Sequence, residues 1–218
     1  MIEAINLCKS VETQSGVLPI LQGINLKINK GETVALVGAS GSGKTSLLGL
    51  LAGLDRPSQG EVKIDGQTLD LMGEEERAAL RGEKVGFVFQ SFQLIPAFTA
   101  LENTVLPLEI TQRKVDRAWA EQLLRRVGLA ERLHHTPPQL SGGEQQRVAI
   151  ARAFVAQPEF LFADEPTGNL DKKTGKMVMD LLFELNETQG STLVLVTHDD
   201  HLADRCQRKL VIDDGRLQ

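Results

Sequence analysis

The eight residues GASGSGKT, 38–45, have the composition of a loop that binds phosphate groups. They follow the apolar run Thr33–Val37 and precede the helical run Ser46–Leu51, which is the order of strand, loop and helix that such a site requires. Glycines let backbone N–H groups approach phosphate oxygens without an intervening Cβ atom, and the start of the following helix adds about half a positive elementary charge. The residues expected to contact the phosphates of a nucleotide are Gly38, Ala39, Ser40, Gly41, Ser42, Gly43, Lys44, Thr45 and Ser46.

Two side chains of this loop have specific expected roles. Lys44 is expected to reach the β and γ phosphates, and the Thr45 hydroxyl is expected to ligate Mg²⁺. A serine- and glycine-rich turn that contains a lysine by chance is the alternative. The loop indicates a nucleotide but does not say which reaction the nucleotide undergoes.

Two adjacent carboxylates end another apolar run, FLFADE, residues 160–165. Asp164 is placed to hold Mg²⁺ beside the phosphate loop, directly or through water. Glu165 is placed to polarise an attacking water, a contribution typically worth about 10²- to 10⁴-fold in rate.

Polar residues follow two further apolar runs. His198 ends TLVLVTH, so a parallel sheet is expected to bring it to the same edge, where it could contact the γ-phosphate or the water. Gln90 follows VGFVF and could ligate Mg²⁺ or water. For each of them the alternative is an ordinary polar residue at the end of a strand.

A second anion-binding helix start is predicted at LSGGEQQR, residues 140–147. Ser141 is a natural helix cap, and Gly142 and Gly143 expose backbone N–H groups beside it. One interpretation is a plain capped helix. The other is that this helix start completes the nucleotide site of another copy of the chain.

Short apolar strands that alternate with helical patterns predict an α/β fold in one domain, 1–218. The stretch Ala100–Pro138 has only helical patterns and is therefore expected to be an inserted helical subregion. Asp65-Gly66 and Asp214-Gly215 indicate tight turns. Two helix faces are predicted from their apolar spacing, one from Trp119, Leu123, Leu124 and Val127 and one from Met177, Leu181, Leu182 and Leu185.

Composition argues against several other classes of protein. The net charge is −5 and the basic residues are dispersed along the chain, which disfavours binding to a nucleic-acid backbone. The amino terminus lacks the features of a signal peptide, and the apolar runs fall short of the roughly 20 residues that span a bilayer. If a membrane is involved, we expect another chain to cross it.

The motifs described above occur in the order seen in ABC-type ATPases, and the chain resembles that family over nearly its whole length. LSGGEQQRVAIARA followed by FLFADEPTGNLD is the most specific part of the resemblance. The family fold is a P-loop NTPase with a central, mostly parallel sheet, an antiparallel β edge and an inserted helical subdomain at about residues 98–156.

The resemblance also implies ATP and Mg²⁺ as ligands and a head-to-tail homodimer around two ATP molecules. Each ATP would be held by the phosphate loop of one copy and by the second helix start of the other copy. Asp171 would lie on the shared interface. The residues implied at that second contact are Ser141, Gly142, Gly143 and Glu144.

Within the family, Ser91–Leu108 and the ADEPTGNLD run are similar to the lipoprotein-release and macrolide-export branch, the LolD and MacB type, and to its YbbA-like stand-alone ATPases. The resemblance implies a separate membrane permease that docks near Gln90–Phe98, and a position on the cytoplasmic face of the inner membrane. The apolar residues of this segment could form the docking groove or belong to the core; they are Phe92, Leu94, Ile95 and Phe98.

One position departs from the family pattern. Relatives usually carry an aromatic residue that stacks on adenine, but this chain has no tyrosine and Val11 occupies about that place. Adenine would then be held by apolar contact, and the sequence leaves the choice between ATP and GTP open.

Three other functions fit the sequence less well than a transport ATPase does. A soluble ABC protein that acts on nucleic acid or ribosomes usually has a coiled-coil insertion or two joined domains, and this chain has neither. A non-catalytic ATP-binding module is disfavoured by the presence of both Glu165 and His198. A GTPase or kinase would leave LSGGE unexplained, and the guanine-reading Asn-Lys-x-Asp pattern is absent from the sequence.

Overall fold

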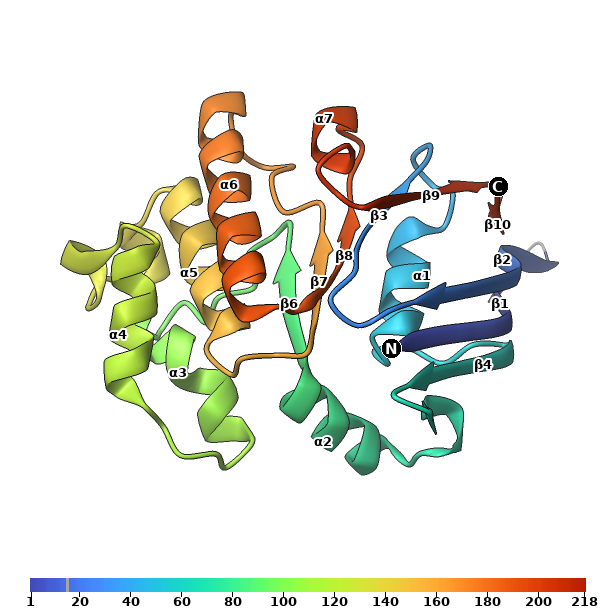
Figure 1. The fold of residues 1–218 in the computed structure, drawn as a ribbon, viewed down its shortest axis with the longest axis horizontal. Coiled ribbons are helices and arrows are strands. Elements are labelled where there is room, and N and C mark those ends of the chain that lie inside the picture. The colour runs from blue at the N-terminus through green and yellow to red at the C-terminus, as the bar shows by residue number, and fades with distance from the viewer. Residues whose placement is uncertain (15) are drawn as a thin grey trace. The chain divides into compact units, whose positions relative to one another are not determined.

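The computed structural model describes residues 1–14 and 16–218, which form two compact units (Figure 1). The first unit comprises Met1–Arg81 and Thr192–Gln218, and the second comprises Gly82–Ser191. Both units combine strands and helices, as the predicted α/β class requires.

The first unit contains two sheets. One is antiparallel, in the order β2-β1-β4-β5, and the other is mixed, in the order β10-β9-β3-β8. In the mixed sheet β3 runs parallel to both β8 and β9, and β10 is antiparallel to β9. The strands are β1 Ile2–Thr13, β2 Gly16–Ile28, β3 Thr33–Val37, β4 Gln59–Ile64, β5 Gln67–Thr68, β8 Thr192–Val196, β9 Arg208–Asp213 and β10 Arg216–Leu217.

The helices of this unit follow its strands and turns. In chain order they are α1 Lys44–Leu51, the 3₁₀ turn Leu69–Leu71, α2 Glu74–Lys84, which continues into the second unit, and α7 Asp200–Ala203. Strand β8 is buried along its whole length, as is typical of a strand covered on both faces.

The two tight turns predicted in this unit are confirmed. Asp65 and Gly66 have φ of 50° and 79° between β4 and β5, and Asp214 and Gly215 have φ of 44° and 72° between β9 and β10. Two successive positive φ values are characteristic of the type I′ hairpin turn, which asparagine, aspartate and glycine tolerate best.

The second unit is mainly helical. Its two strands, β6 Val85–Phe89 and β7 Phe160–Asp164, are parallel, with Phe89 opposite Asp164. The rings of Phe87, Phe89 and Phe162 stack at centroid distances of 5.4 and 5.8 Å. The helices are α3 Ala100–Ile110, α4 Arg117–Arg126, the 3₁₀ turns Ala130–Arg132 and Pro137–Gln139, α5 Gly142–Phe154 and α6 Lys172–Gln189.

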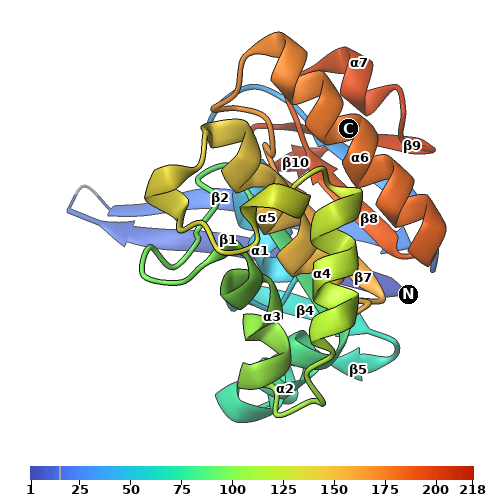
Figure 2. The same cartoon turned by 90° about the vertical axis from the view of Figure 1, so that its left-hand side faces the viewer.

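Helices α3, α4 and α5 pack against one another, as Figure 2 shows. The stretch Ala100–Pro138 contains α-helices and 3₁₀ turns and no strand, as predicted. The first of the two predicted helix faces is confirmed, since Leu123, Leu124 and Val127 are buried and Trp119 is half-buried.

The predicted face of α6 is partly wrong. Met177 is 52% exposed, whereas Val178 and Met179 are buried together with Leu182 and Leu185. The buried stripe is therefore rotated by one to two residues from the predicted one. Met177 and Val178 are both apolar, so the sequence pattern alone does not decide which of them points to the core.

None of the helices in the described part of the chain combines the length and the apolar character that crossing a membrane requires.

Candidate functional site

Residues 38–43 of the phosphate loop join the end of β3 to the start of α1, which contains the last two residues of the motif, Lys44 and Thr45. Gly38 has φ of 148° and Gly43 has φ of 102°. A Cβ atom on Gly38 would collide with the carbonyl oxygen of Ile212, and a Cβ atom on Gly43 would lie 2.9 Å from the carbonyl oxygen of Ile20. Both positions therefore require glycine, because the loop passes directly against neighbouring backbone.

The loop is built to receive an anion. Gly43 occupies the N-cap position of α1 and has no side chain with which to cap the helix. Within residues 1–14 and 16–218, Ser42 Oγ is buried without a hydrogen-bond partner. A helix start without a side-chain cap and an unpaired buried hydroxyl fit the phosphates of a nucleotide.

Lys44 lies over this loop. Its side chain is 7% exposed, and Nζ donates hydrogen bonds to the carbonyl oxygens of Gly38 at 3.0 Å and Ala39 at 2.7 Å. The ammonium group is therefore held against the loop that precedes α1. There it can exchange these carbonyl contacts for phosphate oxygens.

His198 comes to the same edge of the sheet as the phosphate loop. Leu36 of β3 is paired with Val196 of the parallel strand β8, and His198 follows Val196 by two residues, as Gly38 follows Leu36. Thr197 connects the two ends, because its N–H donates to the carbonyl oxygen of Leu36 at 3.3 Å. His198 is exposed at this edge.

Val11 lies on β1 opposite Leu18 of β2, and their exposed fractions are 46% and 52%. Ile20, two residues beyond Leu18 on the same strand, approaches the phosphate loop at Gly43. An exposed aliphatic pair therefore lies on β2, which approaches the loop, and on its neighbour β1. This is the place where the sequence predicts contact with the base.

Gln90 and Glu165 lie at a common edge in the second unit, directly after the paired ends of β6 and β7. Gln90 Nε2 donates to Asn169 Oδ1 at 3.3 Å, and Asn169 Nδ2 donates to the carbonyl oxygen of Gln90 at 3.0 Å. A Cβ atom on Gly168 would lie 2.5 Å from Gln90 Nε2. Asn169 was not among the predicted site residues, although it belongs to GNLD, residues 168–171, which is part of the run that carries the family resemblance.

Glu165 has an unusual backbone conformation. Its φ is 43°, in the left-handed region that non-glycine residues rarely adopt, and its carbonyl oxygen accepts from the N–H of Gly168 at 3.0 Å. Such residues concentrate at functional sites. Asp164 precedes it as the last residue of β7, so the two carboxylates follow one another at the strand end as predicted.

The second helix start is a complete capping box. The N–H of Glu144 donates to Ser141 Oγ at 3.3 Å, and the N–H of Ser141 donates to Glu144 Oε2 at 2.8 Å. The backbone of Ser141 holds the pKa of the Glu144 carboxyl below its ordinary value, and the Ser141 hydroxyl and Arg132 contribute. A Cβ atom on the buried Gly143 would collide with the side chain of Thr174, which places the start of α5 directly against α6.

Asp171 caps helix α6. Its carboxylate accepts from the N–H groups of Lys173 and Thr174, both at 3.1 Å. Hydrogen bonds from the side chain and backbone of Thr174 lead the contributions that lower the pKa of Asp171. Asp171 is exposed, as a residue on a shared interface would be in a single copy.

The structure thus describes the predicted residues in two groups. The first unit carries the phosphate loop, His198 and Val11; the second carries Gln90, the Asp164–Glu165 pair, the Ser141 helix start and Asp171. In the described residues there is no cluster of three or more His, Cys, Asp or Glu side chains that could hold a metal ion. The available oxygen ligands suit Mg²⁺, which typically takes one or two protein ligands together with phosphate and water.

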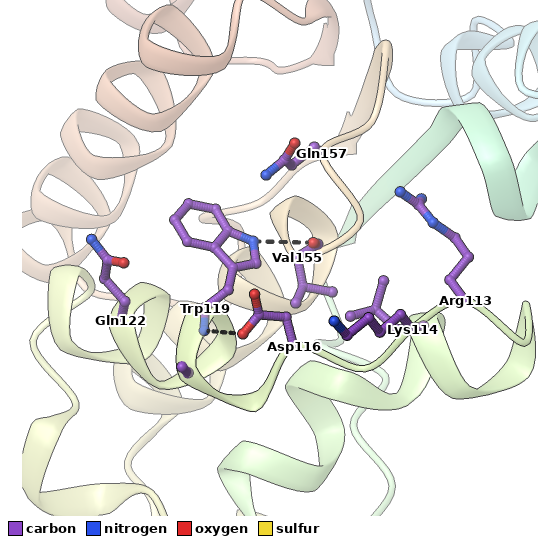
Figure 3. A pocket seen from close by; sticks show the side chains of 9 residues that line it. Arg113, Lys114, Asp116, Trp119, Gln122, Val155 and Gln157 are labelled. Carbon is purple, nitrogen blue, oxygen red and sulfur yellow. Dashed lines mark hydrogen bonds between the residues drawn. The ribbon is translucent and has the colours of Figure 1, made fainter.

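A surface hollow of about 520 Å³ in the second unit contains none of the predicted site residues (Figure 3). Three of its polar lining residues, Arg113, Asp116 and Trp119, make internal contacts. Trp119 Nε1 donates to the carbonyl oxygen of Val155 at 3.2 Å, the N–H of Trp119 donates to Asp116, and Arg113 donates to the carbonyl oxygen of Ala156. These contacts fix the start of α4 and the end of α5 to one another.

Comparison with known proteins agrees with this geometry. Residues 21–168 match the family model described as ABC transporter. The ABC transporter ATP-binding protein YbbA of Escherichia coli (strain K12) is 56% identical, over 100% of this chain and 96% of the relative. The lipoprotein-releasing system ATP-binding protein LolD of Syntrophotalea carbinolica is 50% identical over the same shares.

A solved structure of high similarity is the ATP-binding cassette MJ0796, determined as a dimer in a post-hydrolysis state with ADP and phosphate. It has a TM-score of 0.93 and 42% identity, over 100% of this chain and 97% of that one. Sequence, fold and site agree, and the chain belongs to the family of ABC transporter ATP-binding proteins.

Proposed function

We propose that this chain is the ATP-hydrolysing subunit of a bacterial ABC transporter, working as a dimer that encloses two ATP molecules and drives a separate membrane subunit. The observation that carries the proposal is the presence of two anion-binding helix starts in one chain. One is the start of α1, which follows the glycine loop that Lys44 contacts, and the other is the capped start of α5 at Ser141. A second copy gives each ATP one helix start of each kind.

In the proposed mechanism, Lys44 and the loop N–H groups bind the phosphates in one copy, and Ser141 and Gly143 of the other copy contact the γ-phosphate. Thr45, Gln90 and Asp164 would hold Mg²⁺, whose charge offsets that of the phosphates when it is bound. Glu165 would act on the attacking water as the base, and His198 would contact the γ-phosphate or that water.

The proposed partner is an integral membrane permease. Gln90–Phe98 provides a half-exposed apolar surface for it, with Ile95 36% exposed. A relative of the MacB type, from Syntrophobacter fumaroxidans, is named an ATP-binding and permease protein, and this chain spans 31% of its length at 47% identity. We propose that the permease is supplied here by another chain and that the ATPase binds the cytoplasmic face of the inner membrane through it.

The names of the LolD and MacB relatives refer to lipoprotein release and macrolide export. By analogy, the work proposed for this chain is export or the extraction of a lipoprotein or lipid. The alternative, a soluble ABC ATPase that acts on a partner outside transport, has no observation in its favour.

The test is to purify the chain from membranes with whatever it binds and to measure phosphate release. We expect an integral membrane protein to co-purify and phosphate release to depend on ATP and Mg²⁺. Recovery of ribosomes or nucleic acid in place of a membrane protein, or ATP binding without phosphate release, would contradict the proposal.

Replacing Val11 by Tyr is expected to tighten nucleotide binding. The aliphatic pair of Val11 and Leu18 offers contact area to a base but no aromatic face. A ring at position 11 adds stacking worth about 1–3 kcal/mol per base, for adenine and guanine alike, because every base has a π-face. The measurement is the Kd of ATP and of GTP, with Val11→Ile as the matched control; unchanged Kd values in Val11→Tyr would place the base elsewhere.

A further inference from the structure

The predicted docking segment, Gln90–Phe98, is fixed to helix α5 by one side chain. Arg152 of α5 donates to two successive carbonyl oxygens of the segment, from Nη2 to Phe92 at 2.8 Å and from Nη1 to Gln93 at 2.6 Å. Burial lowers the pKa of the Arg152 guanidinium, so these contacts are partly shielded from water. A planar guanidinium can make such a two-pronged contact, and a lysine ammonium cannot reproduce it.

The two residues that Arg152 contacts are held in an unfavourable conformation. Phe92 has φ of 58° and Gln93 has φ of 49°, and neither is glycine. Two successive left-handed residues persist only where the surroundings enforce them. The forked contact of Arg152 with both carbonyl oxygens provides that enforcement.

The other end of the segment is held by a different helix. Asn103 of α3 is fully buried; its Oδ1 accepts from the N–H of Ile95 at 2.8 Å, and its Nδ2 donates to the carbonyl oxygens of Ile95, Phe98 and Thr99 at 3.0–3.1 Å. The apolar side chains between these anchors remain half-exposed. The backbone of the segment is therefore rigidly attached at both ends while its apolar side chains stay accessible.

We propose that Arg152 is a positioning residue that links the docking segment to helix α5, so that a partner displacing the segment moves the helix that begins at Ser141. This rests on the proposed transport function. Docking at one site would then change the nucleotide contact proposed for Ser141 in the second copy. Arg152 touches neither nucleotide nor partner in this account, and it acts through the backbone of Phe92 and Gln93.

The test compares Arg152→Met with Arg113→Met, since Arg113 is also an arginine of the second unit that donates to a backbone carbonyl, of Ala156 at 3.0 Å. In the complex with its membrane partner, Arg152→Met is expected to lower partner-stimulated phosphate release about tenfold and to leave the basal rate within about twofold. Arg113→Met is expected to leave both rates close to wild type.

A second substitution separates the link from relief of backbone strain. Glycine adopts the left-handed region freely but supplies no contact to α5, so adding Gln93→Gly is expected to leave the stimulation lost in Arg152→Met unrestored. Unchanged stimulation in Arg152→Met, restored stimulation in the double variant, or an equal loss of basal and stimulated rates would overturn the proposal.

A second readout does not depend on the transport function. Amide hydrogen exchange in residues 91–98 of the isolated chain is expected to rise in Arg152→Met and not in Arg113→Met. If wild type shows no stimulation but the exchange rises as expected, the proposed function fails and the positioning role stands. Unchanged exchange in Arg152→Met would refute the positioning role itself.

Discussion

Replacing Glu165 by Gln is expected to slow ATP hydrolysis by about 10²- to 10⁴-fold, the usual contribution of a positioned base. Glu165 directly follows Asp164 at the end of β7, and its backbone is held in the left-handed region by the turn to Gly168. Glutamine keeps the size of the side chain but cannot accept the proton of the attacking water. ATP binding should therefore persist, and single-turnover phosphate release measures the loss.

The matched control is Glu159→Gln, the same substitution just before β7, at its other end. Glu159 forms an ion pair with Lys84 at 3.1 Å and is 42% exposed, so its loss should have little effect on stability or rate. Hydrolysis at the wild-type rate in Glu165→Gln would remove this residue from the proposed mechanism.

Replacing Ser141 by Asp is expected to reduce ATP hydrolysis about 100-fold or more without unfolding the chain. Aspartate caps helices as well as serine does, so the start of α5 should survive. Its carboxylate, however, would face the γ-phosphate bound by the other copy. At a separation of about 4 Å, two like charges repel by about 4 kcal/mol at an effective dielectric constant near 20.

Ser141→Asn is the control, because asparagine caps the helix equally well and carries no charge. Thermal unfolding of both variants checks that the fold is retained, and the ATPase rates report the effect of charge alone. Equal rates in the Asp and Asn variants would show that Ser141 does not face a phosphate, and the second helix start would then be only a capped helix.

Local motifs with a defined backbone requirement could be predicted well from the sequence. Asp65-Gly66 and Asp214-Gly215 demand positive φ, and the structure has tight turns at both places. Gly38 and Gly43 lie in the loop predicted to bind phosphate, and their neighbours leave no room for a Cβ atom. At these positions the residue type itself limits the conformation, so one residue suffices for the inference.

Exposed and polar elements were harder to predict. β1 runs to Thr13 and β2 begins at Gly16. The outer parts of both strands are exposed and their pairing has register shifts, so no regular apolar pattern marks them in the sequence. Helix α2 buries only Arg77 and Leu80, so its sequence lacks the apolar stripe from which a helix is predicted. A hydrophobic pattern in the sequence indicates buried positions, and these elements bury few apolar side chains.

Long-range polar contacts could not be read from the sequence. Nothing in the spacing of Gln90 and Asn169 or of Gln93 and Arg152 indicates that these pairs meet, at separations of 79 and 59 residues. Such pairs depend on how strands and helices are placed by the whole unit. The predicted site residues were therefore found by motif, whereas the residues that position them were found only in the structure.

The most direct test of the account is the mass of the Glu165→Gln chain in solution, measured by sedimentation with and without ATP and Mg²⁺. We expect a monomer without nucleotide and a dimer with ATP, because each γ-phosphate would be held by Lys44 of one copy and Ser141 of the other. A chain that binds ATP and yet stays monomeric, even with its membrane partner supplied, would contradict the claim that two copies share each ATP.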